Sequence, residues 1–555
     1  MSLKNVVRGG MFMRNFHKPF WLTCGPEGGL SLGMVLLALT WHAACLAQTP
    51  MPEATGATAQ FKISGFELTG DIPLKSEDTT RVLAPFIGPA GTLHTLQQAS
   101  SALEAELKNK GYALHRVALP PQEVGAKVTL NIVKFVIGKV TVEGLSRYSE
   151  QNIRASVPEL REGEAPNFKV LAVQTAIANE SAGKQVQVSL KEAEEADKID
   201  VKVSVTESKP WIFSTSLSNT GSDATGQDRV SLVGGHSNVF GLDHQFSGAY
   251  TTSVERAKDV TQLGMNYRVP LYRAGGVLGV SHTRSDVVGN FGAFSSTGAG
   301  QTLGVNYSHY LPPDGGRRSY VTLGIDDKLF KVAQINGAPV PGQLDRRSRP
   351  LTVGYNQRVE SDLAAWGFNA ELALNLPGGS GNDVASYQTE DTRIQRANWR
   401  AVRGAANYSS FFSSGWLWNV RGQFQYSPDA LISGEQFGLG GASSVRGTGE
   451  RPVAGDKGLL ASLELTTPAL RAGLRLLGFI DTGWLNNNSG GVSANKPSSD
   501  QLVSAGLGLR YGGGPYSFSA DWGRLIVGSS VPVTVGASIP QSGDEKVHLN
   551  FLARF

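Results

Sequence analysis

More than 300 residues of this chain alternate between apolar and polar side chains, and this pattern limits the fold more than any other feature. Successive side chains of a strand point to opposite faces, so each alternating segment predicts a strand with one apolar and one polar face. The apolar members of five such segments are Leu263, Met265, Tyr267 and Val269; Leu303, Val305 and Tyr307; Leu351, Val353 and Tyr355; Trp418, Val420, Phe424 and Tyr426; and Val503, Ala505, Leu507, Leu509 and Tyr511.

Strands of this kind build either a transmembrane β-barrel or a soluble β-sandwich. The polar faces here are rich in Gly, Asn and Arg, as a water-filled lumen would be, and the strands are long enough to cross a bilayer at a tilt. The chain also ends on an alternating strand that closes with Phe555. At roughly 20–23 residues for a strand and its loop, residues 209–555 predict an antiparallel transmembrane barrel of about 16 strands.

The overall composition excludes two other classes. Mean hydropathy is −0.15, too low for a bundle of membrane helices. Net charge is only +4, and no Lys/Arg run interleaved with aromatics occurs, so the sequence does not predict a nucleic-acid partner. Glycine accounts for 67 of 555 residues, above the average of about 7%.

The first 47 residues predict a secretory signal peptide. A basic start precedes the apolar segment Leu30–Leu39, and small residues at Cys45 and Ala47 place cleavage after Ala47. Attachment of a lipid to Cys45 is the alternative, although His42 stands where a lipoprotein signal requires Leu. The only other cysteine, Cys24, also precedes the cleavage site, so the mature chain offers neither a disulfide nor a thiolate metal site.

Two small α+β modules are predicted after a polar linker at residues 48–60. The first module covers residues 61–136, beginning with a strand at 61–68, and the second covers residues 137–208. Each shows the order strand, helix, helix, strand, strand. A helix of the first module carries one apolar stripe made of Leu96, Ala99, Leu103 and Leu107.

One glycine- and serine-rich stretch, Phe437–Gly449, contains a single charged residue, Arg446, within Val445-Arg446-Gly447. We interpret residues 432–455 as a long loop folded back into the lumen. Asp481 lies in the strand segment Phe479-Ile480-Asp481-Thr482-Gly483, where Phe479, Asp481 and Gly483 share one face, and it is the expected partner of Arg446. A solvated pair contributes under ~1 kcal/mol, whereas breaking a dry pair costs about 3–5 kcal/mol.

These features resemble the two-partner secretion transporters, the TpsB family of haemolysin secretion/activation proteins. The module order is similar to that of POTRA domains, Val445-Arg446-Gly447 matches the family's V-R-G loop signature, and Phe479, Asp481 and Gly483 match its F-x-D-x-G strand signature. The resemblance implies an outer-membrane transporter whose periplasmic POTRA modules capture an unfolded exoprotein, which the barrel exports without nucleotide hydrolysis. It also implies that Arg446 pairs with Asp481. The family usually has an aromatic residue where this chain has Thr448, which affects the packing of the loop tip.

The resemblance further implies the partners. They are one large secreted exoprotein (an adhesin, a haemolysin or a contact-dependent toxin), outer-membrane lipid, and the barrel-assembly machinery that would recognise the strand ending at Phe555. No HExxH, GxSxG or P-loop motif occurs, so neither an enzyme nor a cofactor is predicted. A barrel-assembly factor of the same superfamily and a passive porin remain the alternatives.

Overall fold

The computed structural model describes residues 60–123, 125, 127–332, 334–335, 338–412, 414–490, 496–533 and 538–555. Within this part of the chain, a first α+β module forms one compact unit, and a second module together with a β-barrel forms the other. The predicted signal peptide with its cleavage site at Ala47, and nearly all of the predicted linker, lie outside the described residues.

The first module packs two helices on a small sheet. Its elements are β1 (Phe61–Ile63), β2 (Gly65–Gly70), α2 (Ser76–Leu83), η3 (Ala84–Phe86), β3 (Gly88–Gly91), α3 (Leu93–Asn109), β4 (His115–Ala118) and β5 (Lys127–Lys134). The sheet order is β2-β5-β4, with β2 parallel to β5. All four members of the predicted stripe on α3 are buried, and they form the core side of that helix. The strand predicted at 61–68 is divided at Ser64, because β1 pairs separately with β3.

The second module has the predicted order strand, helix, helix, strand, strand, without the additional strands β1 and β3 of the first module. It contains β6 (Val136–Glu143), α4 (Glu150–Ser156), α5 (Phe168–Ala178), β7 (Lys184–Glu192) and β8 (Lys198–Glu207), with sheet order β6-β8-β7. Ser149 caps α4 by accepting from the Asn152 N–H, and Asn167 caps α5 by accepting from the N–H groups of Lys169 and Val170. Among the described residues, every helix is too short or too polar to cross a membrane.

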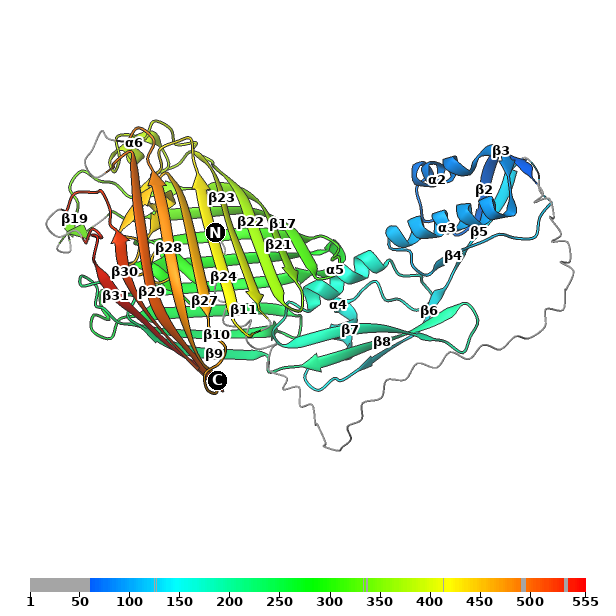
Figure 1. Ribbon diagram of the computed structural model, residues 1–555, viewed down its shortest axis with the longest axis horizontal. Helices are drawn as coiled ribbons and strands as arrows, with labels where there is room; N and C mark the ends of the chain where they lie inside the picture. The colour runs from blue at the N-terminus through cyan, green and yellow to red at the C-terminus, as the bar shows by residue number, and fades with distance from the viewer. Residues whose placement is uncertain are drawn as a thin grey trace, which may run out of the picture. The chain divides into compact units, whose positions relative to one another are not determined.

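The barrel strands of the described chain close into one antiparallel sheet, which Figure 1 shows from the side. They are β9 (Trp211–Ser218), β10 (Arg229–Val239), β11 (His244–Thr252), β12 (Gln262–Leu271), β13 (Gly276–Ser285), β16 (Gly300–Tyr310), β17 (Arg317–Phe330), β20 (Arg346–Ser348) continued by β21 (Pro350–Glu360), β22 (Ala364–Asn375), β23 (Arg400–Phe411), β24 (Leu417–Tyr426), β27 (Lys457–Thr466), β28 (Leu474–Asn486), β29 (Ser499–Gly513), β30 (Tyr516–Val527) and β31 (Glu545–Arg554). Closure comes from β31 pairing with β9. With β20 and β21 counted as one, the wall has 16 strands, which confirms the predicted fold class.

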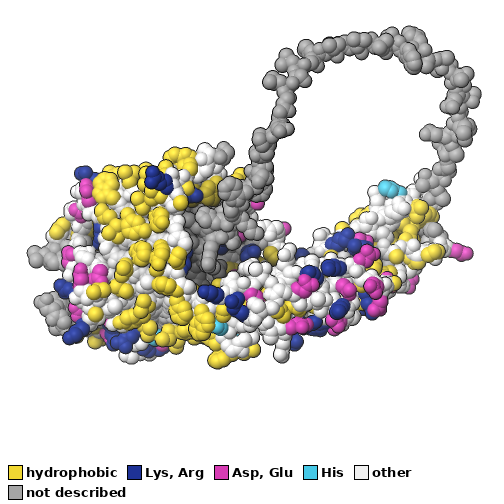
Figure 2. Space-filling model, turned by 90° about the horizontal axis from the view of Figure 1, so that it is seen from below, with side chains coloured by type: hydrophobic (Ala, Val, Ile, Leu, Met, Phe, Trp, Pro, Cys, Tyr) yellow, Lys and Arg dark blue, Asp and Glu magenta, His cyan; other side chains and the backbone are white. Residues whose placement is uncertain are grey.

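The outer face of the wall is apolar. Leu303 and Leu507 are 53% and 65% exposed, and Figure 2 shows hydrophobic side chains spread over the barrel surface. Inward neighbours are small or polar and buried, such as Ser462 and Ser504. A barrel with this arrangement presents its apolar face to lipid and its polar face to the lumen.

Connections alternate between the two ends of the barrel. Short turns, including η4 (Tyr272–Ala274), lie at the end where β9 follows the second module. The opposite end carries the long loops, with small elements β14 (Val288–Phe291), β15 (Phe294–Thr297), β18 (Gln334–Ile335), β19 (Ala338–Pro339) and α6 (Val384–Gln388). Figure 1 shows α6 and β19 at this end.

Candidate functional site

The loop between β24 and β27, residues 427–456, enters the barrel and contacts its inner wall on two sides. It contains η5 (Ser433–Glu435) and a short hairpin of β25 (Phe437–Leu439) with β26 (Val453–Gly455). We call residues 427–456 the lumenal loop. Three charged residues, Glu435, Arg446 and Asp456, hold it to the wall and to its neighbours.

Arg446 meets Asp481 of β28 through two parallel contacts. Its Nε donates to Asp481 Oδ2 at 2.7 Å and its Nη2 donates to Oδ1 at 2.8 Å. The backbone N–H of Arg446 also donates to Oδ2 at 3.1 Å, and the Ser462 hydroxyl donates to Oδ1 at 2.6 Å. The Arg446 side chain is 1% exposed and the Asp481 side chain 0%. Both partners are therefore buried, and the pair falls in the range where removing one partner costs about 3–5 kcal/mol.

Further wall residues complete the surroundings of the guanidinium. Its Nη1 donates to Glu464 Oε1 on β27 at 2.6 Å and lies 3.8 Å from Asp521 Oδ2 on β30. Its Cζ lies 3.4 Å from the ring centroid of Phe479, a stacked cation–π contact. Arg510 pairs with Asp521 at 2.6 Å. Arg421 lies 4.0 Å from Glu464. Arg510 and Arg421 thus balance the two additional carboxylates around Arg446, and the planar guanidinium is fixed in direction as well as in position.

Glycines let the loop tip reach the wall. Gly447 has φ +94°, and a Cβ there would lie 2.9 Å from the Gly523 carbonyl oxygen of β30. Its N–H donates to His548 Nε2 of β31 at 3.2 Å. Gly483 of β28 leaves the space filled by Leu439, whose Cδ2 would be 2.5 Å from an added Cβ. Gly447 of the loop and Gly483 of the strand are therefore required sterically, because a side chain at either position would prevent the close approach of loop and wall.

Apolar packing and internal hydrogen bonds stabilise the tip around Arg446. Val445 is fully buried in a cluster with Leu439 and Leu460. Thr448, which stands where the family usually has an aromatic residue, donates to the Val445 carbonyl at 3.1 Å and accepts from the Gly441 N–H at 3.0 Å. The Thr448 hydroxyl thus stabilises the loop tip by hydrogen bonds within the tip, in place of the packing of an aromatic ring.

Glu435 anchors the same loop to a different sector of the wall. Its carboxylate accepts from Arg403 of β23 at 2.7 Å and from the Ser348 hydroxyl of β20 at 2.7 Å, and it lies 3.3 Å from Lys328 of β17. These strands are separated from β28 and β30 in the order of the barrel sheet. Because the loop is attached to both sectors, it crosses the lumen between them.

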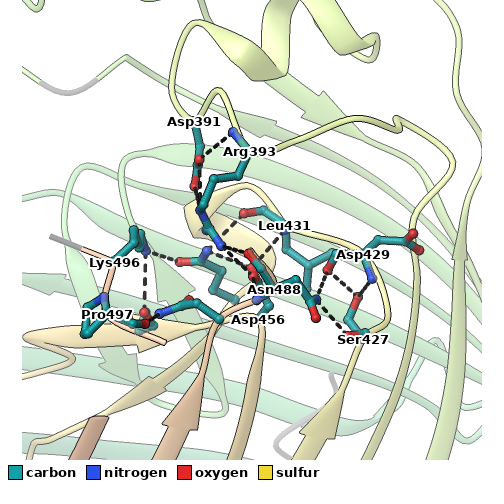
Figure 3. Close-up of polar contacts among 12 residues, drawn as sticks. Asp391, Arg393, Ser427, Asp429, Leu431, Asp456, Asn488, Lys496 and Pro497 are labelled. Carbon is teal, nitrogen blue, oxygen red and sulfur yellow. Dashed lines mark hydrogen bonds and ion pairs between the residues drawn. The ribbon is translucent and has the colours of Figure 1, made fainter. Parts of the chain in front are cut away.

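Asp456 fixes the end of the loop where it joins β27 (Figure 3). Its Oδ2 accepts from Arg393 Nη1 and from the Asn488 N–H, each at 2.9 Å, and its Oδ1 accepts from the Leu431 N–H at 2.9 Å. Arg393 also pairs with Asp391 at 2.7 Å. Figure 3 shows these groups converging from three loops of the long-loop end. Asp456 thus connects the base of the lumenal loop to its two neighbouring surface loops.

The structure brings Arg446, Asp481, Phe479 and Gly483 together in one cluster, with Val445 and Gly447 on either side of the arginine. Phe555 lies apart: it follows β31, is 75% exposed, and donates its N–H to the Phe213 carbonyl at 2.9 Å. Sequence reasoning missed Glu464, Asp521, Glu435 and Asp456. For Glu464 and Asp521 a signal was available: each is a charged residue at a strand position whose side chain points into the barrel. Among the described residues, no group of acidic, His or Cys side chains is arranged to hold a metal ion.

The fold and the site define a class: a membrane β-barrel that follows two small α+β modules and has a loop tied across its lumen. A sequence model of the haemolysin secretion/activation protein family ShlB/FhaC/HecB matches residues 197–511, and a model of the ShlB-type POTRA domain matches residues 61–134. Because the first match spans more than half of the sequence, the chain belongs to the ShlB/FhaC/HecB family.

Individual relatives agree with this assignment. The outer membrane transporter CdiB of Escherichia coli is 23% identical over 88% of this chain and 83% of its own length. The heme/hemopexin transporter protein HuxB of Haemophilus influenzae is 19% identical over 86% and 84%. The solved structure of CdiB from Escherichia coli superposes with a TM-score of 0.71 at 20% identity, covering 91% of this chain and 93% of that one. CdiB from Acinetobacter baumannii gives a TM-score of 0.67 at 16% identity, covering 89% and 90%.

These findings confirm four predictions. The chain is a TpsB-type transporter of the outer membrane, it is built as a barrel with a POTRA-type N-terminal domain, its POTRA region lies in the periplasm, and it is a transporter rather than an enzyme. The identity of the second module as a POTRA domain stays a prediction.

Proposed function

We propose that this transporter captures one large unfolded exoprotein in the periplasm and exports it through the barrel without nucleotide hydrolysis. The observation that carries the proposal is the lumenal loop, which crosses the pore and is anchored by buried Arg446. A passive porin gains nothing from a loop that is tied by buried ion pairs to two sectors of its inner wall. A transporter for a chain needs such an obstruction, because an open pore wide enough for a polypeptide would leak.

Capture rests on the edges of the module sheets. Both sheets have three strands, so each has two edges: β2 and β4 in the first module, β6 and β7 in the second. Residues 189–192 of β7 are exposed, and strand addition there would hold an extended client through main-chain hydrogen bonds. Such bonds are indifferent to client sequence, which suits an unfolded exoprotein. An adhesin, a haemolysin and a contact-dependent toxin all fit this mode.

The polar lumen supplies the path. Small and polar side chains line the inner wall, and the charges near the lumenal loop are paired. Where the wall is apolar, at Leu460, Leu485, Leu502 and Leu525, the seated loop covers it with Leu439 and Val445. We assign Arg446 and Asp481 the role of holding the loop in its seated position between transport events.

Quantitative proteomics of culture supernatant and outer membrane tests the proposal. The comparison is between wild type, a deletion strain, and deletion strains complemented with the wild-type chain, Arg446→Ala or Asp481→Ala. We expect one large exoprotein to disappear from the supernatant on deletion, to return with the wild-type chain, and to remain low with either variant. Other outer-membrane barrels should keep their abundance.

Two outcomes would contradict the proposal. A general fall in outer-membrane barrels on deletion would instead indicate a barrel-assembly factor. An unchanged supernatant and outer membrane would indicate a pore, which conductance of the purified protein would then measure. Normal export by both variants would remove the role assigned to the Arg446–Asp481 pair.

A further inference from the structure

A further buried ion pair lies outside the lumen, where the second module meets the short turns of the barrel. Lys184 begins β7, and its side chain is 0% exposed. Its Nζ lies 2.5 Å from Oδ2 of Asp243, in the turn between β10 and β11, and 3.0 Å from Asn152 Oδ1 of α4. The Tyr272 hydroxyl of η4 donates to the same Asp243 oxygen at 2.9 Å. One carboxylate therefore joins the module to two separate barrel turns.

The turn that carries Asp243 has an unusual backbone. Phe240 and Asp243 have φ values of +56° and +60°, in the left-handed region that residues with a side chain rarely adopt. The Asp243 N–H donates to Asn238 Oδ1 at 2.9 Å, and the Gly241 carbonyl accepts from Asn152 Nδ2 at 2.6 Å. These bonds hold the turn so that the Asp243 carboxylate points into the contact with the module, while the Phe240 side chain is 85% exposed.

An apolar patch and a second ion pair surround this contact. Val173 and Ile177 of α5 pack against Val277 and Tyr310 of the barrel. Arg268 of β12 lies 2.7 Å from Glu180, which follows α5, and these side chains are 14% and 20% exposed. We call this interface between the second module and the barrel turns the dock; it comprises the Lys184–Asp243 pair, the apolar contact through Ile177 and the Arg268–Glu180 pair.

Burial decides what the Lys184–Asp243 pair contributes. Removing the ammonium from water lowers the pKa of Lys184, while the neighbouring Asp243 charge acts in the opposite direction. Desolvation of a buried ion pair offsets much of the attraction between its charges, so such a pair adds little stability compared with an apolar contact of the same volume. It strongly disfavours any other arrangement, however, because a shifted module would leave a buried charge without its partner.

We propose that Lys184 is a positioning residue: with Asp243 and Tyr272 it holds the second module in a single position on the periplasmic turns of the barrel. From this position the sheet edge of the module presents captured chain to the barrel opening. Only the expected effect on secretion rests on the proposed function. The docked position itself is measured independently of any client.

An engineered disulfide reports docking directly. A Cβ on Gly183 would lie 3.4 Å from the Ser237 Cβ of β10, close to the roughly 3.5–4.5 Å found across disulfides. The same Cβ would lie 2.3 Å from the Tyr148 hydroxyl, so the pair is built in a Tyr148→Phe background. The cross-linking parent is therefore the triple variant Y148F/G183C/S237C. Both natural cysteines precede the predicted cleavage site at Ala47, so no other thiol is expected to compete.

The first measurement is the rate of cross-linking in purified full-length protein under mild oxidation. We expect rapid cross-linking in the parent and a rate lower by at least about fivefold after Lys184→Ala, because Asp243 is left buried and unpaired. Adding Asp243→Asn to Lys184→Ala removes the orphan charge and should recover part of the rate. Lys202→Ala, which removes a partly exposed lysine paired with Glu143 in the same module, serves as the matched control and should match the parent.

The second measurement is secretion. Lys184→Ala should reduce export while the barrel keeps its amount and heat-modifiability, and the oxidised disulfide should restore export to the Lys184→Ala protein. This rescue separates positioning from any other role of the lysine. Equal cross-linking rates with and without Lys184 would overturn the proposal, as would an oxidised parent that exports less than the reduced one. If cross-linking follows Lys184 but no strain exports a client, the dock stands and the proposed function falls.

Discussion

The Arg446–Asp481 pair, which we call the lumenal anchor, and the dock both bury a cation against an aspartate, yet they use different cations. Arg446 reaches both oxygens of Asp481 and stacks on Phe479, whereas Lys184 reaches one oxygen of Asp243. A guanidinium fixes the direction of its partner, while an ammonium is a point charge that fixes only a location.

This difference follows from what each cation has to hold. The lumenal loop has little core of its own, so its orientation in the barrel must come from the contacts of a few side chains. The second module is already rigid, with a core that includes Ile153 and Val203, and its apolar contact through Ile177 sets the direction of approach. A point charge is then sufficient to select one position. The predictions below test this contrast, from the largest expected effect to the smallest.

Removing either partner of the lumenal anchor should have the largest effect. Arg446→Ala leaves the Asp481 carboxylate buried without its cation, at a cost of about 3–5 kcal/mol. Asp481→Ala removes both paired contacts of the guanidinium and leaves Arg446 with Glu464, at 2.6 Å, as its remaining close partner. We expect export to fall by at least about tenfold, since each 1.4 kcal/mol changes an equilibrium tenfold. Immunoblotting of the secreted partner measures this, with barrel amount checked by heat-modifiability. Arg524→Ala is the control, because Arg524 and its partner Glu545 are 59% and 45% exposed. An equal loss in the control would mean that the burial of Arg446 is not what matters.

Exchanging the cations should reveal the geometry that each site requires. Arg446→Lys keeps the charge but loses the paired contact with Asp481 and the stacking on Phe479. We expect export to lie between wild type and Arg446→Ala. Lys184→Arg adds volume where the side chain is 0% exposed, and should slow cross-linking of the Y148F/G183C/S237C parent described above. Wild-type export by Arg446→Lys would show that charge alone is enough at both sites, and the contrast between them would disappear.

A substitution at the base of the lumenal loop should change how often the pore opens more than it changes export. Asp456→Asn removes the charge facing Arg393, which keeps its pair with Asp391 at 2.7 Å. We expect more frequent channel opening in planar bilayers, while the loop tip stays seated and export remains close to wild type. Lys331→Ala, which breaks an exposed pair with Asp345 at the same end, should leave the conductance unchanged. A silent Asp456→Asn variant would place control of the closed pore at the tip alone.

The smallest effect should be a pH dependence within the second module. Burial raises the pKa of Glu207, but hydrogen bonds from the Ser146 hydroxyl and the N–H groups of Ser146, Tyr148 and Arg147 outweigh it and lower the pKa overall. A carboxylate whose folded pKa is depressed stabilises the fold above its unfolded pKa and loses that contribution as pH falls through the folded value. Hydrogen exchange of amides 146–148, corrected for intrinsic rates, should therefore show decreasing protection below about pH 4.

Glu207→Gln tests this pH dependence. The variant should be less protected than wild type at neutral pH and should lack the acid-dependent change. Glu150→Gln, on the same module, removes an exposed carboxylate paired with Arg154 and provides the comparison. Protection that changes with pH equally in all three proteins would exclude Glu207 as the source.

The sequence predicted the barrel because alternation is a local property. In each of the segments around Met265, Val353 and Leu507, the alternation indicates which face meets lipid. About 16 such strands in one chain then predict a closed barrel. The pair of Arg446 and Asp481 was also predictable, because each stands alone in a glycine-rich or apolar setting and both match family signatures. Glu464 and Asp521 were missed because nothing local to their strands says that a loop will approach them.

The sequence by itself determined the strand pattern, the two-module order and the two signatures, since these depend on neighbours along the chain. Only the tertiary structure decided that the lumenal loop crosses the pore, because its anchors Glu435 and Arg446 reach wall strands far apart in sequence. It likewise decided that Lys184 meets Asp243, 59 residues away. Burial has the same origin. Whether a charge is solvated or dry depends on every surface that closes around it, and no single segment of sequence records that.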